Sequence, residues 1–400
     1  MKSNSLPRAL KFGAVSLTVA LSLTACGAAN EEDTTVDSGG DTSSSEGGDA
    51  PSLSGELNGA GATSQEAAMT AWKAGFQEAN PEVTVNYDPV GSGGGREGFL
   101  NGAVAFAGSD AYLDETELKA AQKTCSGDPI EIPVYVSPIA VVYNLPEVEE
   151  LQLSPSTLAM IFAGDITSWD DGAIAADNPD AELPSTEITP VHRSDESGTT
   201  ENFTDYLSQV AEAHWTHGPV ESWPIKGGEA ADGTSGVISA VTEGEGTIGY
   251  ADASQAGDLG QALVGVGSEF VGPTQEAAAA VLDESTPVEG RAATDMALDV
   301  NRTTEAAGVY PIVLVSYHVA CSTYDDQGTA ELVKAFESYV ISEEGQAAAG
   351  SRPVPHRSRP PFASRQQPRW TPSRPSKSAS LAVTACQVAA NWLPARESTS

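Results

Sequence analysis

Apolar positions recur with two different spacings between residues 53 and 346. Spacings of three and four residues predict helices, whereas strict alternation and short apolar runs predict strands. The predicted strands lie at 54–58, 83–90, 104–110, 133–144 (one or two strands), 188–191, 246–250 and 308–317. The predicted helices begin near 65, 92, 158, 199, 233 and 331. This alternation of strands and helices predicts an α/β fold.

The N-terminal residues have a different pattern. Residues 1–26 combine a basic start, a short apolar run and the ending L-T-A-C, which is typical of a signal peptide. The ending resembles a bacterial lipobox, and this resemblance implies cleavage before Cys26 and a lipid on its sulfur. A plain secretory signal with an incidental cysteine is the alternative. Residues 27–52 are rich in Gly, Ser, Thr, Asp and Glu, so we expect a disordered acidic tether there.

The composition changes abruptly at residues 350–400. This segment holds eight of the 20 basic residues and eight of the 25 prolines, but only one acidic residue, Glu397. It shows neither helical nor strand spacing. Two interpretations are open, a disordered basic tail and a coding frame that slips near Gly350. We favour the slip, because the break falls inside a helix-like, Ala-rich pattern.

The formal net charge is −36, from 20 basic and 56 acidic residues. Such an excess argues against nucleic acid and anionic lipid surfaces as partners. It does not argue against a small buried anion, because salt screens the long-range repulsion while the donors of a buried site act at contact distance.

The chain has four cysteines, Cys26, Cys125, Cys321 and Cys386. Cys26 is assigned to the lipid and Cys386 lies in the aberrant C-terminal segment. In an exported protein we expect a disulfide between Cys125 and Cys321, with two buried free thiols as the alternative. The sequence has no Cys-x-x-Cys motif and no His/Cys cluster, so we expect no metal.

The strongest candidate site is the stretch V-H-R-S-D-E-S-G-T-T-E-N-F at 191–203. Its S-G-T step can cap the helix predicted to follow and lets the backbone come close to a ligand. The free N–H groups of a helix start and the planar guanidinium of Arg193 suit a tetrahedral oxyanion. An ordinary capped helix with a surface ion pair between Arg193 and Asp195 is the alternative.

Three predicted strands earlier in the chain are followed by small polar residues. Thr63 and Ser64 follow the first strand, Ser92 follows the second and Asp110 ends the third. Ligands of open α/β sheets bind at the carboxyl ends of strands, so we expect these side chains to face one site. For Asp110 the alternative is a loop-capping role.

Six motifs occur in one order along the chain: G-A-G-A-T, V-N-Y-x-x-x-G-S-x-G-G, F-A-G-S-D, S-W-D-D-x-A-I, R-x-D-x-S-G-T and G-x-I-G-Y. In these motifs the chain resembles the PstS family, the phosphate-binding lipoproteins of bacterial phosphate-import ABC transporters. The resemblance implies a two-lobed α/β periplasmic-binding-protein clamp (type II) with two interlobe crossings. The first lobe would comprise 53–134 and the return segment 300–349, and the second lobe 135–299.

Matched motif by motif, the resemblance implies phosphate contacts from Thr63, Ser64, Ser92, Asp110, Arg193, Ser197, Gly198 and Thr199. It also implies that Asp195 supports Arg193. Many family members have a larger apolar residue in place of Ser64, so we expect Ser64 to act through its backbone N–H. Phosphate at neutral pH keeps at least one proton, from which the Asp110 carboxylate can accept a hydrogen bond, whereas sulfate keeps none.

We therefore expect an exported, lipid-anchored monomer without a cofactor, at the extracytoplasmic face of a bacterial cell membrane. It would capture inorganic phosphate and deliver it to the permease of an ABC importer. A sulfate or molybdate binder is the nearest alternative, and an adhesion or sensing protein with the same clamp stays open. A phosphate-ester hydrolase built on His192, Asp195 and Ser197 is less favoured, because residues so close in sequence seldom point at one centre.

Overall fold

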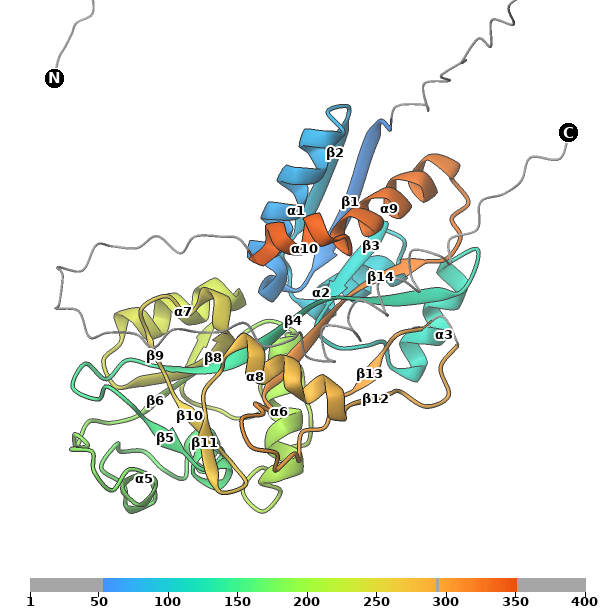
Figure 1. The fold of residues 1–400 in the computed structure, drawn as a ribbon. Helices are drawn as coiled ribbons and strands as arrows, with labels where there is room; N and C mark the ends of the chain where they lie inside the picture. The colour runs from blue at the N-terminus through green and yellow to red at the C-terminus, as the bar shows by residue number, and fades with distance from the viewer. Residues whose placement is uncertain (1–52, 293–294, 351–400) are drawn as a thin grey trace, which may run out of the picture. The chain divides into compact units, whose positions relative to one another are not determined.

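The computed structural model describes residues 53–292 and 295–350 (Figure 1). The predictions made for residues 1–52, including lipid-bearing Cys26, and for the segment after Gly350 lie outside the described residues. Within these ranges the secondary structure is mixed, and the expected α/β fold class is confirmed.

The α-helices are α1 (Glu66–Ala79), α2 (Ser92–Leu100), α3 (Glu115–Thr124), α4 (Pro155–Ala163), α5 (Gly172–Asp177), α6 (Gly198–Val210), α7 (Gly233–Glu243), α8 (Gln275–Ala280), α9 (Gln327–Val340) and α10 (Glu343–Gly350). The short 3-10 helices are η1 (Thr63–Gln65), η2 (Ala253–Gln255) and η3 (Val281–Glu284).

The strands are β1 (Gly55–Gly61), β2 (Val83–Asp88), β3 (Phe106–Ser109), β4 (Pro129–Tyr143), β5 (Gln152–Leu153), β6 (Thr189–Arg193), β7 (Glu229–Ala231), β8 (Thr247–Asp252), β9 (Gly260–Gln261), β10 (Leu263–Val266), β11 (Glu269–Val271), β12 (Thr286–Pro287), β13 (Leu298–Asp299) and β14 (Val313–Cys321).

Some elements differ from the sequence pattern. The apolar run at 133–144 belongs to one strand of 15 residues, β4. The strand predicted at 308–317 begins only at Val313, after Pro311, whose ring nitrogen has no hydrogen to donate to a neighbouring strand. Helix α3 was not predicted, although Asp114 and Glu117 form a capping box at its start.

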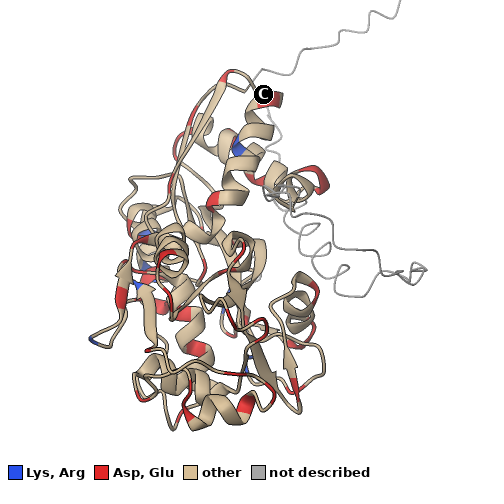
Figure 2. Cartoon of the chain, turned by 90° about the vertical axis from the view of Figure 1, so that its left-hand side faces the viewer, with Lys and Arg blue, Asp and Glu red and all other residues tan. Residues whose placement is uncertain are grey.

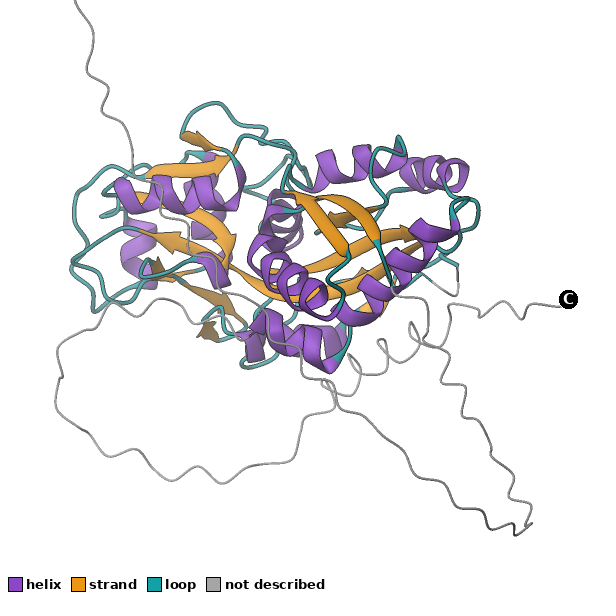
Figure 3. Ribbon diagram, turned by 90° about the horizontal axis from the view of Figure 1, so that it is seen from above, coloured by secondary structure: helices purple, strands orange, loops and turns teal. Residues whose placement is uncertain are grey.

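Strands β4 and β14 run through the middle of the main sheet. Its order is β2-β1-β3-β14-β4-β8-β6-β7, and β9 also pairs with β4. β1 is parallel to β2 and β3, whereas β14 is antiparallel to both β3 and β4. β8 is antiparallel to β4 and parallel to β6. Helices flank the strands (Figure 3), and the parallel strands place their carboxyl ends together.

Two apolar cores define the two lobes. In the first lobe, α1 and α9 pack Trp72, Phe76 and Phe336 against the strands. In the second, a larger core contains the buried side chains Trp169, Phe203, Trp215 and Tyr250. Burying one such ring is worth about 1.5–3 kcal/mol, so each core can hold its lobe together.

The chain passes between the lobes in β4 and again in β14. Tyr135 of β4 packs against both cores. Residues 309–315 still pack in the core of the second lobe, whereas Ala320 packs in that of the first. By this packing the chain leaves the second core within β14, and the lobe limits expected from the family resemblance stay predictions.

Cys125 and Cys321 form the expected disulfide, with Cα atoms 5.3 Å apart. It joins the end of α3 to the end of β14 across 196 positions of sequence. Figure 2 shows Asp and Glu spread over helices and loops, with few basic residues among them. Within the described ranges, every helix is too short or too polar to cross a membrane.

Candidate anion-binding site

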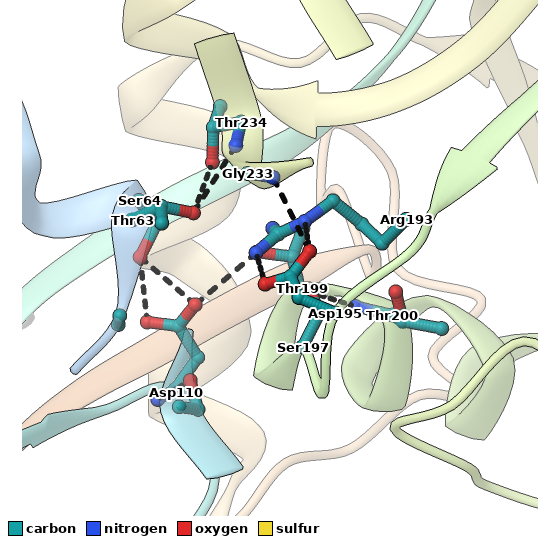
Figure 4. A network of polar contacts seen from close by, with 12 residues as sticks. Thr63, Ser64, Asp110, Arg193, Asp195, Ser197, Thr199, Thr200, Gly233 and Thr234 are labelled. Atoms are coloured by element: carbon teal, nitrogen blue, oxygen red, sulfur yellow. Dashed lines mark hydrogen bonds and ion pairs between the residues drawn. The ribbon is translucent and has the colours of Figure 1, made fainter. Parts of the chain in front are cut away.

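The ends of several strands converge between the two lobes (Figure 4). The first lobe brings Thr63 and Ser64 in η1, directly after β1, and Asp110 directly after β3. The second lobe brings Arg193 at the end of β6 and the start of α6, with Thr199 in its first turn. Five of the predicted residues, from three separate motifs, thus lie together at this point.

Asp110 lies at the centre of this network and is 3% exposed. Ser64 Oγ lies 2.7 Å from Oδ1 and 2.8 Å from Oδ2 of the carboxylate. Thr199 Oγ1 of the second lobe donates to Oδ2 at 3.2 Å. Burial raises the pKa of Asp110, while the hydroxyl groups around it and the charge of Arg193 offset part of the rise. Asp110 is therefore a buried acceptor surrounded by donors.

Arg193 is held in place by Asp195. Its Nε donates to Oδ1 at 2.7 Å and its Nη2 donates to Oδ2, which makes a two-point ion pair. Burial acts to raise the pKa of Asp195, but the hydrogen bond and charge of Arg193 and the N–H of Gly233 outweigh it and lower the pKa. The Asp195 carboxyl group is thus ionised at neutral pH, and Nη1 of Arg193 has no hydrogen-bond acceptor among the described residues.

Helix α6 begins at the point of closest approach between the lobes. Ser197 caps it by accepting from the N–H of Thr200 at 3.1 Å. A Cβ atom on Gly198 would lie 2.5 Å from Ser92 Oγ and 2.8 Å from Asp110 Cβ. Glycine is therefore required by the packing here, although its φ is not in the left-handed region.

The lobes are joined by hydrogen bonds on both sides of Asp110. Thr63 Oγ1 lies 2.9 Å from Thr234 Oγ1 and accepts from the N–H of Thr234 at 3.1 Å. On the other side, Arg96 of α2 donates to Glu221 at 2.7 Å. These contacts describe a closed arrangement in which the first turns of α6 and α7 face η1 and Asp110.

The arrangement of a hydrolytic triad is not formed. His192 Nδ1 lies 3.0 Å from the carbonyl of Arg193, and Nε2 lies 3.2 Å from that of Gly227. The ring stacks on Trp223 at 5.1 Å. The imidazole is therefore engaged with backbone oxygens and does not activate Ser197, whose hydroxyl caps α6.

Comparison with known proteins identifies the family. The sequence matches the PBP superfamily domain (PBP_like_2) over residues 28–344. It is 38% identical over 308 residues to phosphate-binding protein PstS 3 of Mycobacterium tuberculosis, which covers 75% of this chain and 82% of that protein. The chain belongs to the PstS family of phosphate-binding proteins. Phosphate-binding protein PstS of Xylella fastidiosa is 32% identical over 315 residues, 76% of this chain and 83% of its own.

Solved structures agree with the family's fold. A high-affinity periplasmic phosphate-binding protein (PfluDING), solved with bound phosphate, superimposes with a TM-score of 0.60 at 24% identity. The superposition covers 74% of this chain and 88% of that protein. This likeness supports the two-lobed periplasmic-binding-protein fold expected from the motifs.

The family motifs did not indicate every residue around Asp110. Ser316 of β14 donates to Asp110 Oδ1, and Asn202 of α6 donates to the Asp110 carbonyl at 2.7 Å. Ser316 could have been noticed as a lone hydroxyl inside the apolar run V-L-V-S-Y, and Thr234 because D-G-T-S-G is similar to the S-G-T step before α6. Ser92 accepts from the N–H of Asp110 at 3.1 Å, so its hydroxyl supports the loop.

Proposed function

We propose that this PstS-family chain captures inorganic phosphate between its two lobes, at the network around Asp110 and Arg193. The observation that carries the proposal is the chemistry of Asp110, a buried carboxylate among hydroxyl donors from both lobes. The proposed contacts are Thr63, Ser64, Ser92, Asp110, Arg193, Ser197, Gly198 and Thr199, with Asp195 supporting Arg193.

Asp110 and Arg193 would recognise different features of the ligand. The guanidinium and the first-turn N–H groups of α6 favour any tetrahedral oxyanion. Asp110 favours only an oxyanion that still carries a proton, because its oxygen can then accept a hydrogen bond. Against sulfate it would face a bare oxygen, and two buried acceptors would oppose each other. Phosphate is therefore preferred over sulfate and molybdate.

The setting we propose is that of a binding component for an ABC importer. In this proposal the lipid on Cys26 anchors a monomer at the extracytoplasmic face, and the closed lobes present phosphate to a membrane permease. The curated relatives are named phosphate-binding proteins, which supports transport rather than catalysis. The engagement of His192 with backbone carbonyls supports the same choice.

Calorimetric titration of the purified full-length chain tests the proposal. We expect tight one-to-one binding of phosphate at neutral pH and no heat above dilution with sulfate or molybdate. A chromogenic phosphate ester should show no turnover in the same preparation. Equal affinity for phosphate and sulfate would contradict the role of Asp110, and turnover of the ester would contradict a pure binding function.

A further inference from the structure

A chain of buried polar side chains connects Asp110 with the interior of the first lobe. It runs from Glu337 of α9 through His318 of β14 and Gln65 of η1 to Ser316, which contacts Asp110. All five side chains are almost fully buried, with exposures of 0–3%. Buried polar groups in a well-packed lobe carry a cost unless each finds a partner, so this chain calls for an explanation.

The direction of each hydrogen bond in the chain follows from its neighbours. Gln65 Nε2 donates to Ser316 Oγ at 2.7 Å and to the carbonyl of Tyr317 at 3.2 Å. A carbonyl can only accept, which fixes the orientation of the Gln65 amide. Gln65 Oε1 therefore faces His318 Nε2, 3.0 Å away, and that nitrogen must carry the proton. Ser316, which accepts from Gln65, is left to donate to Asp110.

The other end of the chain fixes the imidazole. His318 Nδ1 lies 2.8 Å from Glu337 Oε2, a distance that requires one proton between the two atoms. The ring is packed edge-on against Trp72 at 5.7 Å and parallel to Phe336 at 6.2 Å. His318 can therefore neither rotate nor exchange partners without breaking the core of the lobe.

We propose that His318, held by Glu337, is a positioning residue that acts through Gln65 and Ser316 to keep Asp110 able to accept a hydrogen bond from the protonated oxygen of bound phosphate. The proposal rests on the proposed function and deepens it. Without the Nε2–H of His318, the Gln65 amide loses the partner of its oxygen. The amide nitrogen still faces the carbonyl of Tyr317, so Gln65 is then held at its nitrogen alone, and Ser316 is less firmly held in the position from which it donates to the carboxylate.

The expected consequence is a change in how affinity depends on pH. The Asp110 carboxylate is stabilised by its donors against burial, so the loss of one donor raises its pKa further. A protonated Asp110 cannot accept from phosphate, and binding is then lost at a higher pH than in the parent. The other titratable groups that face Asp110 are Tyr87, Arg193 and Asp252.

The test compares substitutions at His318 in the full-length chain, with phosphate affinity measured by calorimetry from neutral to acidic pH. His318→Leu removes the donor, and we expect affinity to fall about tenfold. We also expect the decrease of affinity on the acidic side of the pH profile, here called the acid limb, to move to higher pH. His318→Gln places an amide N–H near the position of Nε2 and should restore most of both. The protonation of free phosphate changes with pH in the same way for every variant, so this effect cancels in the comparison.

Two further variants separate positioning from packing. Phe336→Leu loosens the packing beside His318 without touching a polar link, so it should lower the melting temperature and leave the acid limb in place. Ser316→Ala should reproduce the effect of His318→Leu, and the double variant should add little, because both act through one hydrogen bond to Asp110. If His318→Leu does not fold, Gln65→Met breaks the same chain with a similar volume.

The outcomes distinguish this proposal from the proposed function. A parent protein that fails to bind phosphate overturns both. A parent that binds, with a folded His318→Leu variant of equal affinity and equal acid limb, overturns only the positioning role. Additive losses for His318→Leu and Ser316→Ala also overturn it, because they show two independent effects.

Discussion

Asp110 lies in a buried position, where a carboxyl group is harder to ionise than in water. Burial raises its pKa, and only hydrogen bonds and the charge of Arg193 act in the opposite direction. The balance matters for the proposed site, because the ionised form would accept a hydrogen bond from the ligand, whereas the protonated form would offer one at the same oxygen. In the proposed site, selectivity between two anions of similar shape would thus depend on one side chain and its donors.

Asp110→Asn is the direct test of this balance. The amide keeps the size of the side chain but can turn an N–H toward the anion, so we expect the phosphate-to-sulfate preference to fall at least about tenfold. Folding should change less than selectivity. Competition calorimetry with both anions gives the ratio, and an unchanged ratio in the variant would remove Asp110 from discrimination.

Arg193→Ala removes the buried guanidinium that faces the site. We expect phosphate affinity to fall by about ten- to a hundredfold, because a charge-assisted hydrogen bond is lost and Asp195 is left without its partner. Lys119→Ala is the matched control, since it removes one positive charge from an exposed side chain paired with Glu115. Equal affinities for parent, variant and control would exclude Arg193 from the site.

At the scale of elements, the start of α6 is fitted against the other lobe. The Cβ atom introduced by Gly198→Ala would meet Ser92 and Asp110, and two loops would have to move apart. We expect the lobes to close less completely and phosphate affinity to fall at least about tenfold, with little change in melting temperature without ligand.

The control for this prediction is Gly172→Ala in α5, where a Cβ atom would meet nothing within 4 Å. Calorimetry and thermal unfolding of both variants, with and without phosphate, separate a loss of closure from a loss of stability. Gly198→Ala with the affinity of the parent would show that the lobes do not need to approach so closely.

The elements also show how much could be predicted from the sequence. Thr63, Asp110 and Arg193 lie in local motifs at strand ends, so the pattern that predicts the strands also predicts that these residues meet. Ser316 and His318 depend instead on the register in which β14 pairs with β3, where Tyr317 stands opposite Ser109. A shift of one residue would turn both side chains to other faces, and no local signal fixes that register.

Long-range pairing limits the prediction of the lobes in the same way. The disulfide between Cys125 and Cys321 could be predicted because only two cysteines remained after the others had been assigned. The point at which the chain returns to the first lobe could not be predicted. The apolar run that ends in β14 shows no break in the sequence, although its first part, residues 309–315, packs in the second core. Helix α3 was missed because its apolar face is weak and buries only Ala121.

At the scale of the whole molecule, an acidic chain binds an anion. The net charge of −36 repels phosphate at a distance, and the charge of the Arg193 guanidinium is already paired with that of Asp195. Capture should therefore be opposed by the long-range field and favoured only at contact. The Debye length falls from about 30 Å at 0.01 M salt to about 8 Å at 0.15 M, so added salt screens the repulsion first.

We therefore expect the association rate constant for phosphate to rise several-fold between these two salt concentrations, the reverse of a protein that steers anions with a basic surface. The dissociation rate constant should change little, because the contacts that hold the ligand are buried. Stopped-flow measurement of intrinsic tryptophan fluorescence gives both constants. Exchanging exposed Lys119 for Glu makes the net charge more negative and should steepen the salt dependence without changing dissociation. A rate constant that falls with added salt would show that a local positive potential, and not the acidic surface, governs the approach of phosphate.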